Sequence, residues 1–154
     1  MKDCGMAIIT DEMKKKAIGL ETRATIEVEK GLIRKYCEAV GDDNVLWTDS
    51  DAARRGPNGT MVAPPGLFHS VFMVGPRPDL PFELPVTKIL DGGGEWEYFE
   101  PARPGDTLKV LSRIADLYER ESGGGSMVFV VYETTWKNQG GELVAHARGT
   151  RIIR

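Results

Sequence analysis

The sequence predicts an α+β fold, and three features of the 154-residue chain lead to that prediction. A stripe of apolar residues at helical spacing runs through residues 30–40, and residues 61–75 are apolar nearly all round. From residue 91 onward, polar and apolar residues alternate as they do in antiparallel strands. Helices that come before a run of strands, instead of alternating with them, are typical of α+β proteins.

The first half of the chain is predicted to contain one strand and two main helices. Alternation predicts a strand over residues 22–29, and the apolar stripe predicts a helix over residues 30–40 that ends at Gly41. A polar segment with a short helical turn at residues 51–55 follows. Two prolines and a glycine then open the apolar run of residues 61–75, which predicts a buried helix.

The second half is predicted to be an antiparallel meander of strands. The β-branched and aromatic residues of this region fall into four alternating stretches, at residues 95–99, 107–119, 127–136 and 142–153. Turn residues separate these stretches at 103–106, 122–125 and 138–141. We expect residues 1–18 to be an N-terminal extension and residues 19–154 to form one domain.

Composition and charge exclude several classes of protein. A net charge of −3, with no long run of Lys or Arg, makes a nucleic-acid partner improbable. The two cysteines, Cys4 and Cys37, form neither a disulfide framework nor a metal-binding cluster with histidine, so we expect no metal. The longest uninterrupted apolar stretch, residues 127–132, is far too short to cross a membrane. We therefore expect a cytoplasmic protein without a membrane partner.

Residues 41–49, Gly-Asp-Asp-Asn-Val-Leu-Trp-Thr-Asp, carry the most information about function. They resemble the Gly-Asp-x-Asn-Pro-x-His segment of MaoC-like dehydratases and (R)-specific enoyl-CoA hydratases. Asp42 and Asn44 match this segment, but Val45 replaces the proline and Trp47 stands where the histidine belongs. The resemblance extends over most of the chain, and its other supports are residues 49–53, 62–66, 103–106 and 141–144.

The resemblance implies a hot-dog fold, in which a curved antiparallel sheet wraps around one central buried helix. It is strongest to the N-terminal-type MaoC domain, which includes the non-catalytic subunit of heterodimeric 3-hydroxyacyl dehydratases. The family acts on acyl-CoA or acyl-carrier-protein thioesters and needs no cofactor. Its sites are built from paired hot-dog domains, so the resemblance also implies a homodimer or a heterodimer.

The same resemblance assigns roles to the residues of the matching segment. Asp and His together hold and deprotonate a water in that family, so Asp42 and Asn44 become candidate catalytic residues. A neutral histidine accepts a proton, whereas an indole N–H only donates, so Trp47 cannot replace the missing base. Trp47 either packs as a structural aromatic or caps an acyl-binding pocket. Asp42 has an ordinary alternative too, because aspartate is common just past a helix end.

A second group of candidates surrounds the predicted buried helix. The family uses a glycine here to approach the thioester carbonyl, so the Gly66 amide becomes the candidate for stabilising the developing oxyanion. The alternative is that this segment merely starts a helix. His69 lies one turn further on and is either a replacement base or a partly buried structural histidine. His146, in the last strand, is a weaker candidate. The substrate-binding candidates are Trp47, Pro65, Leu67, Phe68 and Arg103.

Three functions remain open from the sequence. The first is an acyl-binding subunit for (R)-specific hydration of 2-enoyl-CoA or the reverse dehydration, beside a MaoC-like partner that carries the catalytic histidine. The second is a self-sufficient hydratase or thioesterase in which Asp42 works with His69. The third is a module that binds acyl-CoA without turning it over.

Overall fold

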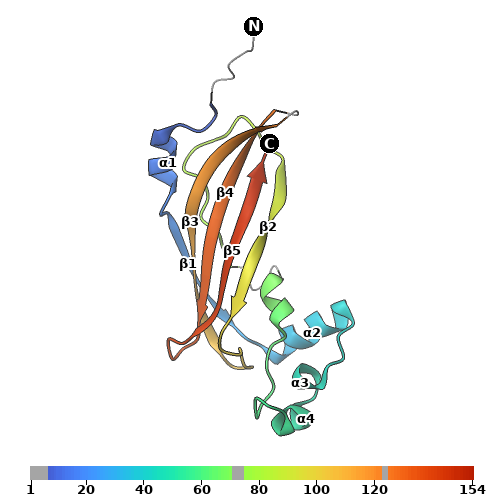
Figure 1. Ribbon diagram of the computed structural model, residues 1–154. Helices are drawn as coiled ribbons and strands as arrows, with labels where there is room; N and C mark the ends of the chain where they lie inside the picture. Colours follow the sequence, from blue (N-terminus) through green and yellow to red (C-terminus); the bar gives the residue numbers. More distant parts are fainter. Residues whose placement is uncertain (1–6, 71–74, 123–124) are drawn as a thin grey trace.

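The fold is built on one antiparallel sheet of five strands, as the computed structural model shows for residues 7–70, 75–122 and 125–154 (Figure 1). In the order in which they pair, the strands are β1 (Glu21–Glu27), β3 (Thr107–Ser122), β4 (Gly125–Lys137), β5 (Leu143–Ile153) and β2 (Ile89–Tyr98). Hairpins join β3 to β4 and β4 to β5, and β1 and β2 form the two edges. The part of the predicted meander formed by β3, β4 and β5 is therefore confirmed, but β2 pairs with β5 instead of with β3, the strand that follows it in the sequence. Strand β2 also begins several residues earlier than expected.

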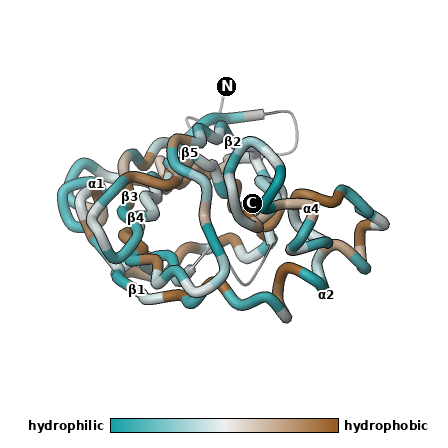
Figure 2. Tube along the Cα trace, turned by 90° about the horizontal axis from the view of Figure 1, so that it is seen from below, coloured by the Kyte–Doolittle hydropathy of each residue, from teal (hydrophilic) through white to brown (hydrophobic). Residues whose placement is uncertain are grey.

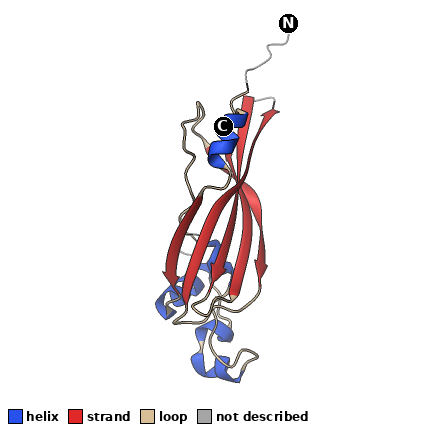
Figure 3. Ribbon diagram, turned by 90° about the vertical axis from the view of Figure 1, so that its left-hand side faces the viewer, coloured by secondary structure: helices blue, strands red, loops and turns tan. Residues whose placement is uncertain are grey.

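The helices lie at the two ends of this curved sheet. Helix α1 (Asp11–Ala17) lies near one end of the strands, whereas α2 (Lys30–Val40), α3 (Val45–Thr48) and α4 (Ser50–Arg55) gather at the other end (Figures 1 and 3). Figure 2, a view along the strands, shows α2 and α4 on one side of them and α1 on the other. No helix within the described part of the chain is long and apolar enough to cross a membrane.

Helix α2 follows the prediction from sequence residue for residue. Its apolar stripe buries Ile33 and Cys37 against the sheet, while the charged residues face solvent. The helix ends at Gly41, which adopts the left-handed conformation (φ 72°) and donates its N–H to the carbonyl of Cys37. Glycine is favoured there because it has no Cβ to clash in that conformation.

The helix predicted over residues 61–75 is shorter in the structure. Only Pro65–His69 is helical, as a 3₁₀ helix that starts after Pro64 and ends at Ser70, and residues 71–74 of the prediction lie outside the described residues. The helix is nevertheless buried where it meets the sheet, through Leu67 and Phe68. An apolar run flanked by prolines predicts burial well but fixes the type and length of a helix poorly.

Two clusters of buried residues form the core. The larger one joins α2 and the 3₁₀ helix to the sheet, through residues that include Ile33, Leu67, Phe68, Val110 and Trp136. The smaller one lies at the end near α1 and contains Ile114, Leu117, Val128 and Tyr132. Ile9 and Ala17, from the segment expected to be an N-terminal extension, are buried in this second cluster.

A row of charges crosses the sheet on the face opposite the core. Arg113, Glu133 and Arg148 are neighbours in register on β3, β4 and β5. The Glu133 carboxylate accepts hydrogen bonds from both guanidinium groups, at 3.0 Å from Arg113 Nε and 2.7 Å from Arg148 Nη1. The hydrogen bond from Arg113, above all, lowers the pKa of Glu133 below its usual range.

This lowered pKa predicts a pH-dependent contribution to stability. Because the pKa of Glu133 is lower in the folded protein than in the unfolded chain, its stabilisation is present above the unfolded value of about 4.3 and is lost as the pH falls through the folded value. Glu133→Gln should therefore lower the free energy of unfolding at pH 7, and the difference from wild type should shrink at acidic pH. Urea denaturation of both proteins at several pH values measures this; a difference independent of pH would contradict it.

Candidate functional site

The loop between α2 and α4 holds the segment singled out by sequence, and its polar side chains organise the backbone. Asp42 Oδ1 accepts a hydrogen bond from the backbone N–H of Asn44 at 3.1 Å. Asn44 in turn caps α3, with its Oδ1 accepting from Leu46 N at 3.0 Å. Each of these two residues therefore stabilises a turn or a helix start, which is the structural role that the sequence left open for Asp42.

Trp47 lies against the core from this same loop. Its ring is half-buried and packs on the larger core cluster. Its indole Nε1 is buried and has no hydrogen-bond partner among the described residues. A buried donor without a partner costs free energy, and it cannot accept a proton from a water. The position that the family gives to a base therefore holds a packed aromatic side chain in this chain.

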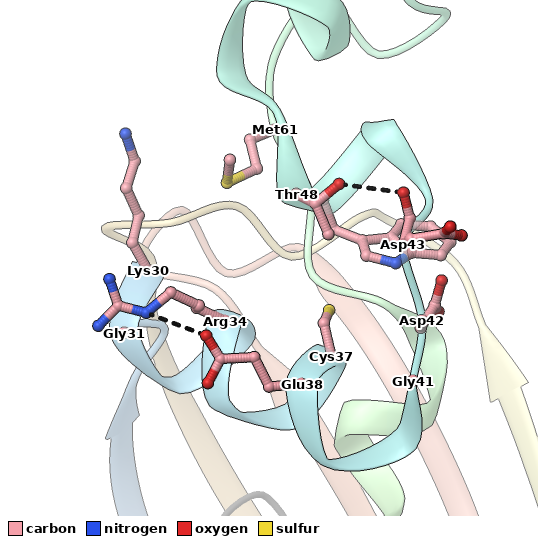
Figure 4. Close-up of a pocket in the computed structure, with 11 residues that line it drawn as sticks. Lys30, Gly31, Arg34, Cys37, Glu38, Gly41, Asp42, Asp43, Thr48 and Met61 are labelled. Atoms are coloured by element: carbon pink, nitrogen blue, oxygen red, sulfur yellow. Dashed lines mark hydrogen bonds and ion pairs between the residues drawn. The ribbon is translucent and has the colours of Figure 1, made fainter.

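A cavity of about 630 Å³ opens beside Trp47. Asp42, Trp47 and Cys37 line it together with charged residues of α2. Figure 4 shows Asp42, Cys37 and the side chains of α2 around one space. Burial, and next the charge of Asp42, raise the pKa of Cys37, so its thiol stays protonated at neutral pH. No histidine is among the described residues that line this cavity. Asp42 thus faces the cavity without a histidine beside it.

His69 lies in a different place from Asp42. Its ring stacks on Trp96 with centroids 4.1 Å apart, and its Nε2 is 2.9 Å from the hydroxyl of Tyr98. It is exposed, not partly buried as the structural alternative assumed, because it sits at the end of the 3₁₀ helix. With Leu67 it lines a second cavity of about 720 Å³, which shares only Gly31 and Arg34 of α2 with the cavity at Asp42. The structure thus does not bring Asp42 and His69 into one cavity.

Gly66 lies directly against a tyrosine that the sequence had placed on the apolar stripe of α2. A Cβ at Gly66 would lie 2.1 Å from Tyr36 Oη, so any larger residue would collide with this side chain. Tyr98 secures the preceding residue by donating its hydroxyl to the carbonyl of Pro65 at 3.1 Å. Tyr36 and Tyr98 were missed as site residues, because nothing in the sequence spacing links α2 or β2 to Pro65 and Gly66.

Phe68 and Arg103, two further substrate-binding candidates, make contacts that stabilise the fold. Phe68 is buried and packs edge-on against Tyr98 and Trp136, with centroids 5.7 and 5.9 Å away. Arg103 N donates to Asp106 Oδ2 at 2.7 Å within the turn that precedes β3. Among the described residues, no group of three or more His, Cys, Asp or Glu side chains is arranged to hold a metal ion. Of the candidates around the predicted buried helix, Leu67 and His69 line the 720 Å³ cavity.

The contact between Gly66 and Tyr36 predicts the result of a double-mutant cycle. Gly66→Ala should lower the free energy of unfolding by about 1–3 kcal/mol, because Tyr36 must move to admit the methyl group. In a Tyr36→Phe background most of this cost should disappear. Gly31→Ala is the control, since a Cβ there has nothing within 4 Å. Equal costs of Gly66→Ala in both backgrounds, measured by urea denaturation, would refute this account.

Comparison with known proteins places the chain in a family. The family model that matches residues 16–147 describes a FAS1-like dehydratase domain region. The probable enoyl-CoA hydratase alpha subunit of Thermomonospora curvata is 28% identical over 90% of this chain and 48% of its own length. The chain therefore spans about half of that relative.

Solved structures agree on the fold. The truncated HadBC 3R-hydroxyacyl-ACP dehydratase complex of Mycobacterium tuberculosis has a chain with a TM-score of 0.71 and 20% identity, covering 90% of this chain and 98% of its own. The MaoC-like dehydratase of Rhodospirillum rubrum has a TM-score of 0.67 and 24% identity, covering 89% and 92%. These similarities confirm the α+β hot-dog fold. Since the family model spans most of the sequence, the chain belongs to the FAS1-like dehydratase domain family.

Proposed function

We propose that this chain is the acyl-thioester-binding subunit of a two-chain hydratase, which adds water to a 2-enoyl thioester with (R) specificity or catalyses the reverse dehydration. The observation that carries the proposal is Trp47, a packed aromatic with a buried indole N–H at the position of the family's histidine. A positioned acid or base contributes roughly 10²- to 10⁴-fold in rate, so a chain that lacks this group needs a second protein to supply it. A MaoC-like partner with an intact Asp-x-Asn-Pro-x-His segment supplies it.

The chain's own titratable groups favour a partner over self-sufficiency. Asp42 is engaged with the backbone of Asn44, and the described walls of its cavity hold no histidine. His69 contacts Trp96 and Tyr98 and lines two other cavities, neither of which is lined by Asp42. Proton transfer requires the acid or base to be within hydrogen-bond reach of its target, directly or through one water. Two groups that face different cavities do not meet this requirement together.

The names of similar proteins point the same way. The Thermomonospora relative is named an alpha subunit, and the HadBC structure is a complex of a 3R-hydroxyacyl-ACP dehydratase. We therefore assign the acyl-binding role to this chain and the Asp–His pair to its partner. In this proposal the ligand is an acyl-CoA or acyl-carrier-protein thioester, with the Gly66 amide near the thioester carbonyl and Leu67 beside it.

Reconstitution with a partner tests the proposal. The chain is mixed or co-expressed with a MaoC-like subunit that carries the intact segment, and the loss of enoyl-thioester absorbance is followed with crotonyl-CoA and a longer trans-2-enoyl-CoA. The complex should turn over at least roughly 10²-fold faster than this chain alone, the factor expected of a positioned base. It should also be faster than the partner alone, which lacks the acyl-binding subunit. A partner that reaches its full rate alone, with no change when this chain is added, would overturn the proposal.

A further inference from the structure

A small cavity lies on the core-facing side of the sheet, away from Asp42. It has a volume of about 240 Å³, and its walls include Arg77, Tyr132 and Gly149. Tyr132, Gly149 and Gly94 are neighbours in register on β4, β5 and β2, so two residues without side chains lie beside a buried tyrosine. This missing volume leaves a hollow next to the Tyr132 ring.

The side chain of Arg77 enters this hollow. Its guanidinium carbon lies 5.2 Å from the centroid of the Tyr132 ring, and its Nη2 would be 3.8 Å from a Cβ at Gly149. A second guanidinium, of Arg151, lies 5.4 Å from the same ring. Contact with an aromatic face stabilises one cation, but it does not remove the repulsion between two.

Two carboxylates lie near these arginines, but neither forms an ion pair with them. Asp91 is opposite Arg151 in register, and its Oδ1 accepts a hydrogen bond from Gly93 N at 2.9 Å. Asp79 is close enough to influence Tyr132 but is exposed. Within the described ranges, neither Arg77 nor Arg151 forms an ion pair with a carboxylate. The Arg77 guanidinium therefore lines the cavity without a directly paired carboxylate among the described residues, and Asp91 acts on it only at longer range.

One buried donor of the cavity-lining residues also lacks an acceptor. Arg77 Nε is buried and has no hydrogen-bond partner in the described part of the chain. Burial, and then the charge of Arg151, lower the pKa of Arg77, and the charge of Asp91 offsets only part of this shift. Burial raises the pKa of Tyr132, so its hydroxyl remains a hydrogen-bond donor at neutral pH. Buried donors without partners cost free energy, which a bound acceptor recovers.

We propose that this cavity binds a small oxyanion, held by the guanidinium of Arg77 and the hydroxyl of Tyr132. The fork of an arginine matches the two oxygens of a carboxylate or phosphate, and such charge-assisted hydrogen bonds are the strong ones. At about 240 Å³ the cavity admits a small organic acid or free phosphate but not a whole acyl-CoA. His69 and Trp96 also line this cavity, but it shares no lining residue with the cavity at Asp42. The proposal does not depend on the proposed hydratase function.

A salt-matched titration of the whole chain tests the site. Acetate, propionate and phosphate are each compared with chloride at equal ionic strength, with the melting temperature and the ¹⁵N resonance of each arginine Nε–H as readouts. The oxyanions should raise the melting temperature and shift the Arg77 resonance, whereas chloride should not. A preference for the organic acids over phosphate, or the reverse, identifies which source of oxyanion the cavity selects.

Variants show whether the response comes from this cavity. Arg77→Gln should weaken binding roughly tenfold or more, because it removes a charged donor pair, and Tyr132→Phe should weaken it by a smaller factor. Arg120→Gln is the matched control: Arg120 also lies over aromatic rings, those of Tyr118 and Phe129, but it is exposed. If Arg77→Gln does not fold, Tyr132→Phe alone decides, and binding equal to that of wild type would count against the site. An Arg77 resonance unmoved by every oxyanion, or equal binding by wild type and Arg77→Gln, would overturn the proposal.

Discussion

Trp136→Ala should lower the free energy of unfolding by about 3–5 kcal/mol. Trp136 is completely buried, and its ring lies 5.3 Å from Trp96 and 5.9 Å from Phe68, measured between centroids. Its removal leaves a void between the sheet and the 3₁₀ helix, and these rings cannot fill it without moving away from their other contacts. Urea denaturation at pH 7 measures the effect.

Phe99→Ala is the control for this substitution. Phe99 is also aromatic but is 53% exposed, so its removal should change the free energy of unfolding by no more than about 0.5 kcal/mol. A similar loss of stability in both variants would mean that Trp136 does not join the sheet to the helical segments as described. If Trp136→Ala lowered the free energy of unfolding only slightly, this role of Trp136 would be contradicted too.

In the reconstituted two-chain enzyme, the partner's histidine should matter far more than Asp42 of this chain. Replacing that histidine with alanine should reduce turnover roughly 10²- to 10⁴-fold, because it removes the positioned base. Asp42→Asn should change turnover only severalfold, since an asparagine Oδ1 can still accept the hydrogen bond from Asn44 N. The rate of loss of enoyl-thioester absorbance compares the two variants with the unmodified complex.

The size of the Asp42→Asn effect separates two kinds of enzyme. A loss as large as that of the partner's histidine would mean that Asp42 takes part in proton transfer, and the assignment of the Asp–His pair to the partner would be wrong. The matched variant in the same loop is Asp49→Asn. Asp49 also caps backbone N–H groups, of Asp51 and Ala52, and so reports the cost of disturbing the loop alone.

The sequence predicted those parts of the fold in which local signals agree with one another. The apolar stripe of α2 and the glycine after it both predict the same helix, and the structure has that helix with the same bounds. The four strands of the second half also follow from alternation and turns, but the pairing of β2 with β5 instead of β3 does not. Residues 61–75 differ, because an apolar run flanked by prolines fits either a long helix or a short turn of 3₁₀ helix.

The candidate site was harder to predict, because its geometry depends on contacts between distant segments. Tyr36 reaches Gly66 from α2, and Tyr98 reaches Pro65 from β2, over separations that leave no pattern in the sequence. Arg77 was hidden for the same reason, since it lies in a proline-rich loop and meets Tyr132 only in the folded protein. The roles of Asp42 and Asn44 as local caps, by contrast, depend on neighbours two residues away and were foreseen as an alternative for Asp42.

The measurement that tests the central claim most directly is turnover of enoyl-CoA by this chain alone. The purified chain is incubated with crotonyl-CoA and with a longer trans-2-enoyl-CoA, beside a heat-inactivated control, and the enoyl-thioester absorbance is followed. With Trp47 in place of the histidine, we predict no loss of absorbance above the control, while the longer enoyl-CoA still raises the melting temperature of the chain. Turnover by the chain alone, abolished by Asp42→Asn or by His69→Ala, would contradict the account and identify a self-sufficient enzyme.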